Sequence, residues 1–493
     1  MFSDIISNAR VYILQMYAAT VVSLVYMNVA ISVAYSAVLI PALKNSADPI
    51  EITDQEEMWI VNCVSLVIPC VCVLPGYATD LFGRLWVLKM TVIAHVAGWV
   101  TIALANSGTT LIIGRVIVGL GLAFQLGPCF VYISEISSPT MRGALLIFPT
   151  LTFSLGTLLV YLEGYFASWR AVAWFSCGYG VIFISLLYTI PSSPFWLVAK
   201  QRTEDAKKAL EWLNKYQPIE NVQQIVQTEL GKIQEEQEEN RIRCKTSSKV
   251  QEFFLPTTYK PFIILTLLLI IQQFAGSYVV VMNAIIFFQE IGTKTDPYLA
   301  STYMAATRFL TTFIYVILTK KFGKRPVLMV SFLGMAISMA VSGLYTYWIR
   351  TGTTEYTWVP LVMLFLYYVF TAGVLGIPFS LAGELFPVPV RGIACNVAFG
   401  LLYFFSFIAV SSYPLLLDGL GGMDGLQYFF AMVALVGVAF TFLFVPETAN
   451  KRLAEIEKYF WSHTFAIFES REDKLNEDKI SKKNPKKIFI EFP

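Results

Sequence analysis

The sequence predicts an all-α membrane protein in which twelve transmembrane helices form two similar bundles of six. Of the 493 residues, 56% are hydrophobic and only 14% are charged, whereas the surface of a soluble domain needs more charge. Twelve apolar stretches are long enough to cross a hydrocarbon core of about 30 Å as helices. The formal net charge of +2 gives no basic footprint for a nucleic acid. The expected surroundings are therefore a lipid bilayer.

The twelve spans are separated by short polar connections, except for one long insertion. Their approximate limits are 11–40, 58–79, 85–106, 108–134, 144–162, 171–190, 262–289, 298–319, 326–348, 358–383, 393–417 and 426–446. The first apolar stretch is too long for the apolar region of a cleavable signal peptide. We therefore expect it to remain as the first span.

Basic residues are divided unevenly between the two sets of connections. One set holds eleven of them, namely Arg10, Arg84, Lys89, Arg142, Lys320, Lys321, Lys324, Arg325, Arg391, Lys451 and Arg452. The opposite set holds four (Lys44, Arg170, Lys294 and Arg350) and an acidic stretch between residues 48 and 57. Because loops rich in Lys and Arg stay in the cytoplasm, both termini are expected to be cytoplasmic.

The long polar insertion divides the chain into four parts. We expect an N-terminal six-helix bundle over 1–197, a cytoplasmic helical linker over 198–260, a C-terminal bundle over 261–450 and a largely disordered tail over 451–493. Within the linker, Thr203 followed by Glu204 and Asp205 is a good helix start, because acids suit the positive end of the helix dipole. A second linker helix is expected from about 219 to 240.

Three short patterns occur twice, at separations of 240 to 255 residues. Glu135 precedes Arg142-Gly143 as Glu384 precedes Arg391-Gly392, Phe82-Gly83-Arg84 matches Phe322-Gly323-Lys324-Arg325, and Pro191 matches Pro446. These repeats predict two halves of common origin. Such halves usually enclose a solute site near the middle of the bilayer and rock about it, so the repeats indicate a transporter.

These and further segments together resemble the sugar porter family of the major facilitator superfamily over nearly the whole chain. The segments are Gly76–Arg84, Gly114-Arg115 with Gly119 and Gly121, Pro128–Ile136, Pro191–Leu197, Gln272-Gln273 with Gly276, Glu384–Pro387 and Val445–Thr448. Around Ala34-Tyr35-Ser36 and Gly276-Ser277-Tyr278 the chain is most similar to the insect facilitated trehalose transporter branch. The resemblance implies the major facilitator fold, location in the plasma membrane and a sugar substrate.

Charged residues at the cytoplasmic helix ends suggest a gate. They are Asp80, Arg84, Glu135 and Arg142 in the first half and Arg325, Glu384 and Arg391 in the second. We hypothesise that they form ion pairs across the inner mouth, which hold it shut while the protein faces outward. The alternative is that these charges only orient the protein during its insertion into the membrane.

A sugar site should combine uncharged hydrogen-bonding groups with aromatic faces. Gln272 and Gln273 are adjacent amides within an apolar span, and an unpaired buried amide costs on the order of 1–3 kcal/mol. The resemblance assigns both to sugar hydroxyls, although they could instead pair with neighbouring helices. Asn283 lies eleven residues after Gln272, on about the same helix face, and is expected to line the same cavity.

At four further site positions the resemblance implies a changed cavity. Thr150 stands where the family usually has a glutamine, and Tyr278 where it has an asparagine. Phe379 replaces a tryptophan of span ten, and Tyr403 is the aromatic residue expected in span eleven. Because these changes reshape the cavity, glucose itself need not be the substrate.

Two arginines within the spans bear on mechanism. Arg308 lies in the middle of span eight, where a charge is costly unless it is paired or hydrated. It could reach a substrate oxygen, select an anionic solute or bond backbone carbonyls. Proton-driven members of the family pair an aspartate of span one with the arginine of span four, here Arg115. The matching position is Ser36, which favours facilitated diffusion.

The sequence therefore predicts a facilitative sugar transporter, for trehalose or a hexose, that works by alternating access. Two alternatives stay open at this stage: a transporter of another small organic solute, either neutral or anionic, and a non-transporting sugar sensor on the same fold. We expect no enzyme activity, cofactor, metal site or obligate protein partner. The only two histidines, His95 and His463, lie far apart in an apolar run and in the polar tail.

Overall fold

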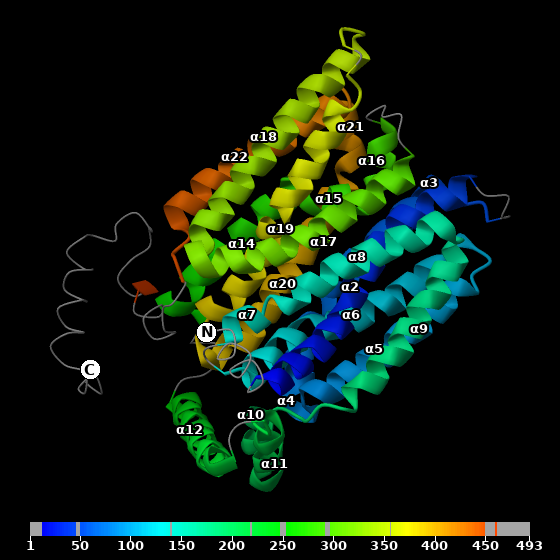
Figure 1. The fold of residues 1–493 in the computed structure, drawn as a ribbon. Helices are drawn as coiled ribbons and strands as arrows, with labels where there is room; N and C mark the ends of the chain where they lie inside the picture. The colour runs from blue at the N-terminus through cyan, green and yellow to red at the C-terminus, as the bar shows by residue number, and fades with distance from the viewer. Residues whose placement is uncertain are drawn as a thin grey trace, which may run out of the picture.

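The computed structural model describes residues 12–45, 50–138, 141–216, 219–246, 253–290, 296–354, 356–448 and 459–460. Regular structure in these ranges is entirely helical. Two groups of helices stand side by side in Figure 1, with α11 and α12 beneath one end of the bundle. We call this end the linker end and the opposite one the far end.

The first group, called the N-half, contains the six predicted spans of the first bundle. Its helices are α2 (Ile13–Asn45), α3 (Asp54–Val71), α4 (Leu74–Phe82), α5 (Arg84–Ala103), α6 (Gly108–Ile136), α7 (Arg142–Leu145), α8 (Phe148–Phe166) and α9 (Trp169–Leu187). Span two is divided into α3 and α4, which meet at 62°, and span five is divided into α7 and α8. Pro75 and Pro149, in the first turns of α4 and α8, explain these breaks, because proline has no N–H to donate to the preceding turn.

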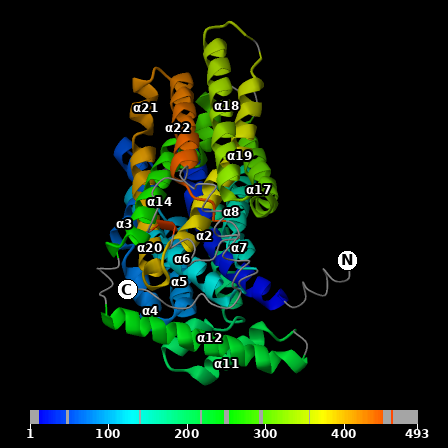
Figure 2. The ribbon, with the colours of Figure 1, turned by 90° about the vertical axis from the view of Figure 1, so that its left-hand side faces the viewer.

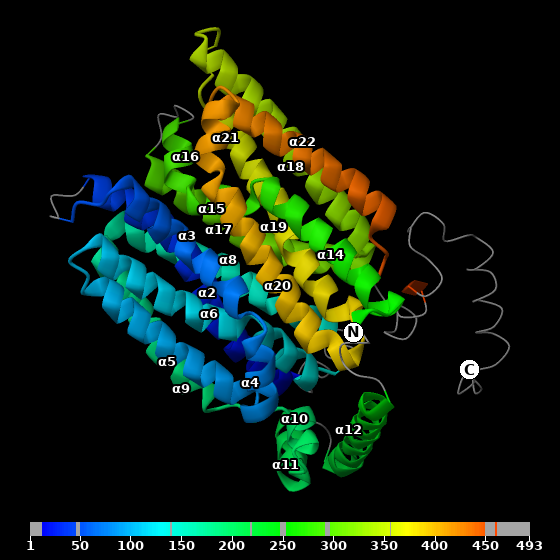
Figure 3. The same cartoon turned by 180° about the vertical axis from the view of Figure 1, so that it is seen from behind.

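The second group, called the C-half, contains the other six predicted spans and is seen from behind in Figure 3. Its helices are α14 (Pro256–Phe274), α15 (Ser277–Met282), α16 (Ala284–Glu290), α17 (Pro297–Phe322), α18 (Lys324–Arg350), α19 (Val359–Leu385), α20 (Val388–Ser411), α21 (Tyr413–Gly419) and α22 (Met423–Phe444). Here span seven forms three helices, and span eleven is interrupted before Pro414.

Helix packing confirms the predicted repeat. Within the N-half, α5 packs on α6 and α9, while α2 packs on α8; within the C-half, the corresponding α18 packs on α19 and α22, while α14 packs on α20. Between the halves, α3 packs on α20 and α8 packs on α17. These last two contacts are also related by the repeat, because spans two and five correspond to spans eight and eleven. The halves therefore meet as a pseudo-symmetric pair.

Ten described helices are long and apolar enough to cross a membrane, and the bent pair α3–α4 makes eleven. The remaining predicted span, α17, has 26 residues but carries Arg308 and several threonines, so its hydropathy falls short. Its outer face is nevertheless apolar: Leu310, Ile314 and Ile317 are all exposed. Exposed apolar side chains in this arrangement suit lipid, so α17 also fits as a span.

The linker forms both predicted helices at one end of the bundle (Figure 2). They are α11 (Thr203–Leu213) and α12 (Ile219–Thr246), preceded by the short α10 (Pro194–Ala199). Thr203 is the first residue of α11, but the cap position is Arg202, which pairs with Asp205 at 2.7 Å. The indole Nε1 of Trp196 donates to the carbonyl of Asp80 at 3.2 Å, which joins the linker to the end of α4. The predicted tail, 451–493, lies outside the described residues except for 459–460.

Candidate solute-binding site

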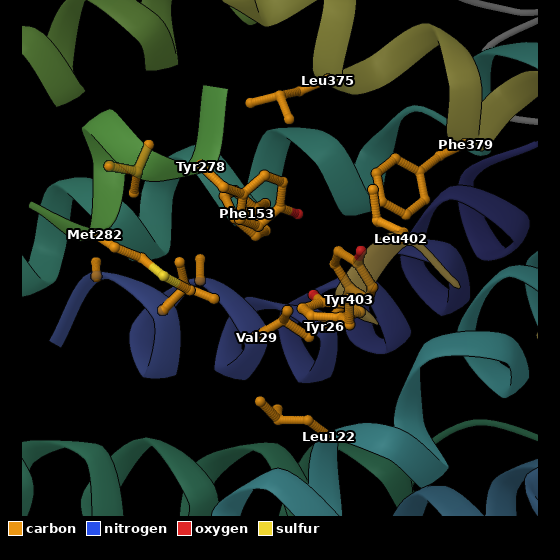
Figure 4. Close-up of a cluster of buried hydrophobic side chains, with 14 of the residues drawn as sticks. Tyr26, Val29, Leu122, Phe153, Tyr278, Met282, Leu375, Phe379, Leu402 and Tyr403 are labelled. Carbon is orange, nitrogen blue, oxygen red and sulfur yellow. The ribbon is translucent and has the colours of Figure 1, made fainter. Parts of the chain in front are cut away.

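A cavity of about 230 Å³ lies between the two halves, at the mid-length of α17. Its lining consists of Tyr26 from α2, Thr150 and Phe153 from α8, Tyr278 from α15, Arg308 from α17, and Leu375 and Phe379 from α19. Figure 4 shows Tyr26, Phe153, Tyr278, Leu375 and Phe379 arranged around this space, with Tyr403 beside Tyr26. Both halves thus contribute aromatic rings, and hydroxyl groups are available next to them. We call this space the central cavity.

A glycine at the break in span seven lets Tyr278 reach the central cavity. α14 ends at Phe274, and Gly276 then adopts φ +88°, a left-handed conformation that L side chains rarely take. A Cβ atom at this position would also stand 2.7 Å from the ring of Phe430. Glycine is therefore required here, and α15 starts in a new direction immediately after it.

Aromatic rings close the central cavity on one side and join the two halves. The ring of Phe130 from α6 lies 5.8 Å from that of Phe379 and 5.7 Å from that of Phe399, and these last two rings are 5.0 Å apart. Tyr26 meets Phe130 edge-on at 5.3 Å. Flat apolar surfaces of this kind suit the apolar face of a sugar ring.

A second cavity, of about 350 Å³, extends from the central cavity along α17. Both cavities are lined by Thr150, which therefore lies at their junction. The other lining residues are Ile147, Thr312, Tyr315, Thr319, Lys324, Ala372, Gly373, Gly376, Ile377 and Ser380. Because Lys324 begins α18 at the linker end, the second cavity leads toward that end. We call it the vestibule.

The structure brings together some of the predicted site residues and leaves others apart. Thr150, Tyr278, Arg308 and Phe379 all line the central cavity, and the ring of Tyr403 lies 6.2 Å from that of Tyr278.

Gln272, Gln273 and Asn283 are not part of that lining. The two glutamines are fully buried in α14, and neither side-chain amide has a hydrogen-bond partner in the described structure. Asn283 caps α15, and its Nδ2 donates to the carbonyl of Val279 at 3.1 Å. Sugar binding by these three residues therefore stays a prediction.

Three residues that line the central cavity were not predicted from the sequence. Phe153 follows Thr150 by three positions, which places both on one face of α8, so its spacing could have revealed it. Tyr26 and Leu375 lie in uniformly apolar spans, where no local pattern separates a cavity-facing side chain from one that packs against a helix. Only the arrangement of the two halves selects them.

In the N-half, the predicted gate residues form a compact network. Arg84 Nη2 lies 2.9 Å from Glu135 Oε1, and its Nη1 lies 3.6 Å from Asp80. The hydroxyl of Ser193 donates to the other oxygen of Glu135 at 2.5 Å. Arg142 is the first residue of α7. This network ties the ends of α4, α5 and α6 to the start of the linker.

In the C-half, Lys324 takes the position expected for Arg325. Its Nζ lies 2.6 Å from Glu384 Oε1 and donates to the hydroxyl of Ser380 at 2.6 Å. Lys324 follows Gly323 as Arg84 follows Gly83, so aligning these glycines would have identified it. Arg325 instead donates to the carbonyl of Phe442. The side chain of Arg391 lies outside the described residues, and pairing across the mouth stays a prediction.

Glu447 holds the start of α18. Its two carboxylate oxygens accept the backbone N–H groups of Lys324 and Arg325, each at 3.1 Å. These N–H groups belong to the first turn of a helix, where they have no partner within the helix. A carboxylate also suits the positive end of the helix dipole, so the end of span twelve fixes the turn between spans eight and nine.

Arg115 is fully buried within the N-half, with every donor nitrogen of its guanidinium occupied. Nε donates to the carbonyl of Ile60 at 3.1 Å, Nη1 donates to the carbonyl of Ser32 at 2.7 Å, and Nη2 donates to the hydroxyl of Ser36. Ser36 therefore takes the place of the carboxylate that the resemblance associates with proton coupling.

The family described as "Sugar (and other) transporter" matches residues 16–460. The chain belongs to this family. Among curated relatives of this sugar transporter, the facilitated trehalose transporter Tret1 of Bombyx mori is 30% identical over 447 residues, which cover 90% of this chain and 86% of that protein. Tret1 of Apis mellifera ligustica is 28% identical over 462 residues, or 93% and 90% of the two chains. The predicted family and branch are thereby confirmed.

Solved structures agree with the fold of this sugar transporter. The proton:xylose symporter XylE bound to 6-bromo-6-deoxy-D-glucose superposes with a TM-score of 0.75 at 23% identity and covers 91% of this chain and 99% of its own. An inward open conformation of the xylose transporter XylE from E. coli gives a TM-score of 0.68, also at 23% identity, and covers 90% and 99%. These similarities confirm the predicted major facilitator fold.

Proposed function

We propose that this sugar transporter carries a sugar, with trehalose and the hexoses as reference substrates, by facilitated diffusion through alternating access. The central cavity is the observation that carries the proposal. It lies between the pseudo-symmetric halves, and its described lining combines hydroxyl groups with aromatic rings. Transporters built from repeats bind their solute at such an interface. Family membership and the trehalose transporters among the relatives point in the same direction.

Contacts between the halves suggest how the far end closes. The hydroxyl of Tyr161 in α8 donates to the carbonyl of Val281 in α15 at 2.5 Å. The hydroxyls of Ser154 and Thr312, which are 3.1 Å apart between α8 and α17, join the halves farther from the far end, where Thr312 lines the vestibule. α15 is bounded by Gly276 and Asn283, so it can turn without moving the whole of α14. In this mechanism α15 leaves Tyr161 when the far end opens.

At the linker end, the vestibule wall carries Lys324, which Glu384 and Ser380 hold in place. Separation of this pair would widen the solute path toward the cytoplasm. The corresponding pair in the N-half, Arg84 and Glu135, braces the linker helices instead. We therefore propose that the ion pair of Lys324 and Glu384 is the gate at the linker end.

The proposal includes the plasma membrane as location and a cytoplasmic linker end. The linker follows six spans, and the turns at Gly83 and Gly323 follow two and eight. Since each count is even, all three segments lie on one side of the membrane. Both turns lead directly into basic residues, Arg84 and Lys324–Arg325, and such segments stay in the cytoplasm.

We propose that transport is not coupled to protons. The hydrogen bond from Nη2 of Arg115 is accepted by the neutral hydroxyl of Ser36, and α2 contains no Asp or Glu that could bind and release a proton. The full chain should be reconstituted in proteoliposomes and given labelled trehalose, glucose and fructose, with and without an imposed proton gradient. Saturable uptake that needs no gradient and accelerates against preloaded sugar is the expected result. A strict need for the gradient would overturn uniport, and binding without uptake would favour a sensor.

A further inference from the structure

Arg308 is a buried cation on the wall of the central cavity. Its side chain is only 1% exposed, and its Nε and Nη1 have no hydrogen-bond partner in the described structure. The guanidinium carbon lies 4.9 Å from the centre of the Phe153 ring, an arrangement that offsets part of the cost of burying the charge. Of the three roles that the sequence left open, bonding backbone carbonyls does not account for these two nitrogens.

The groups around Arg308 are neutral. Four tyrosines lie within electrostatic range, namely Tyr161, Tyr278, Tyr367 and Tyr368. Two of their hydroxyls already donate elsewhere, that of Tyr161 to Val281 and that of Tyr367 to Ala275. No carboxylate occurs among the described residues that line the central cavity. A charge in the middle of a membrane is normally paired, so the missing negative partner is expected to come from the solute.

The path from the central cavity to the linker end is also positive. Arg308, Thr312, Tyr315 and Thr319 follow one another on α17 at intervals of four, three and four residues, which places them on one helix face. Arg308 lines the central cavity and the other three line the vestibule, which ends at Lys324. Neither described lining contains Asp or Glu. A negatively charged solute would therefore meet hydroxyl groups and two cations along its route.

We propose that Arg308 is the specificity residue for a carboxylate on the transported sugar, and that the substrate class is a sugar acid such as a hexuronate. This inference rests on the proposed function and narrows it. A guanidinium is well suited to a carboxylate, because hydrogen bonds between ionised partners are short and strong.

Glucuronate and glucose form a matched pair of probes, because they differ only in a carboxylate or a hydroxymethyl group at C6. The full chain in proteoliposomes should take up labelled glucuronate with a kcat/KM about tenfold or more above that for glucose. In Arg308→Gln this ratio should fall by about 10- to 100-fold, and glucuronate should no longer raise the unfolding temperature of the purified protein. Arg308→Lys, which keeps the charge, should recover part of the preference.

Arg350→Gln is the matched control, since Arg350 lies at the far end of α18 and pairs with Asp424 at 2.9 Å. It should leave the glucuronate preference unchanged. Uptake of glucose or trehalose without glucuronate would overturn this inference and leave the proposed function standing. A folded Arg308→Gln protein that still prefers glucuronate would also overturn it. If neither neutral sugars nor glucuronate enter, both proposals fail together.

Discussion

Among the described residues, each half buries one arginine within its spans, and the two side chains have opposite surroundings. In the N-half, the carbonyls of Ile60 and Ser32 and the hydroxyl of Ser36 occupy the three guanidinium nitrogens of Arg115. In the C-half, Nε and Nη1 of Arg308 have no partner in the described structure. Arg115 holds α2, α3 and α6 together, whereas Arg308 faces a cavity. Burial alone therefore does not distinguish a structural arginine from one that awaits a ligand.

The first spans of the halves differ in a related way. In the N-half, α2 runs without a break for 33 residues. In the C-half, the corresponding span is divided into α14, α15 and α16, with Gly276 and Asn283 between them. A continuous helix moves as one body, whereas a divided one can turn at its breaks. We therefore expect the N-half to be the more rigid of the two, and α15 of the C-half to move locally at the far end.

Replacing each arginine by methionine gives the largest contrast. Arg115→Met should lower the free energy of unfolding by about 3–5 kcal/mol, because three hydrogen bonds from a charged donor are lost. Arg308→Met should leave it unchanged or raise it by up to about 4 kcal/mol, because an unpaired buried charge is removed. Thermal unfolding of the purified variants in detergent, without substrate, measures both. Equal losses of stability in the two variants would show that Arg308 is as much a structural residue as Arg115.

Gly276→Ala tests whether the break in span seven is a required feature. The left-handed conformation costs an alanine about 1–2 kcal/mol, and its Cβ would stand 2.7 Å from Phe430. We expect a loss of about 1–3 kcal/mol in stability and slower transport. Gly178→Ala in α9 is the N-half control, since no atom lies within 4 Å of its Cβ position. That variant should be neutral or up to about 1 kcal/mol more stable. Similar behaviour of the two variants would remove the case for a hinge at Gly276.

The smallest expected effect distinguishes the two ion pairs at the linker end, Lys324–Glu384 and Arg84–Glu135. A cysteine replacing Thr319 in the vestibule would report accessibility to a water-soluble thiol reagent, in a background in which the exposed Cys70 is replaced by serine. Glu384→Gln should increase its labelling about two- to fivefold, as expected for the loss of an ion pair worth about 0.5–1 kcal/mol. Glu135→Gln should change it less, because Arg84 and Glu135 do not line the vestibule.

A charge exchange checks the direction of this last effect. Lys324→Glu combined with Glu384→Lys restores an opposite pair and should return the labelling toward that of the unaltered pair. Equal labelling in Glu384→Gln and Glu135→Gln would assign both networks to bracing of the helix ends, with no gate in either half.

Much of the fold could be predicted because lipid imposes simple rules on a sequence. Each span must be apolar over about 20 residues, so the limits of α5, α6 and α18 could be placed within a few positions. The repeated glycines at 83 and 323 predicted the matching turns. The breaks were harder to predict, because Gly276 could equally have been accommodated within a regular helix.

The candidate site was only partly predictable. Tyr278 and Phe379 were found through the resemblance, and both line the central cavity. Phe153 could have been found from its spacing to Thr150, whereas Tyr26 and Leu375 carry no distinguishing pattern in their uniformly apolar spans. Gln272 and Gln273 are conspicuous amides in the sequence, yet they lie outside the described lining of the central cavity.

The sequence by itself determined the spans, the two related halves and the expected orientation, since these follow from hydropathy, repetition and the position of basic residues. Only the tertiary structure decided which polar groups find partners. In the sequence, Arg115 and Arg308 are each an arginine within an apolar run. The groups that bond such a side chain lie on other helices, so they are identified only when those helices pack together. Packing within the N-half gave every guanidinium nitrogen of Arg115 a partner, whereas packing between the halves left two nitrogens of Arg308 facing the solute path.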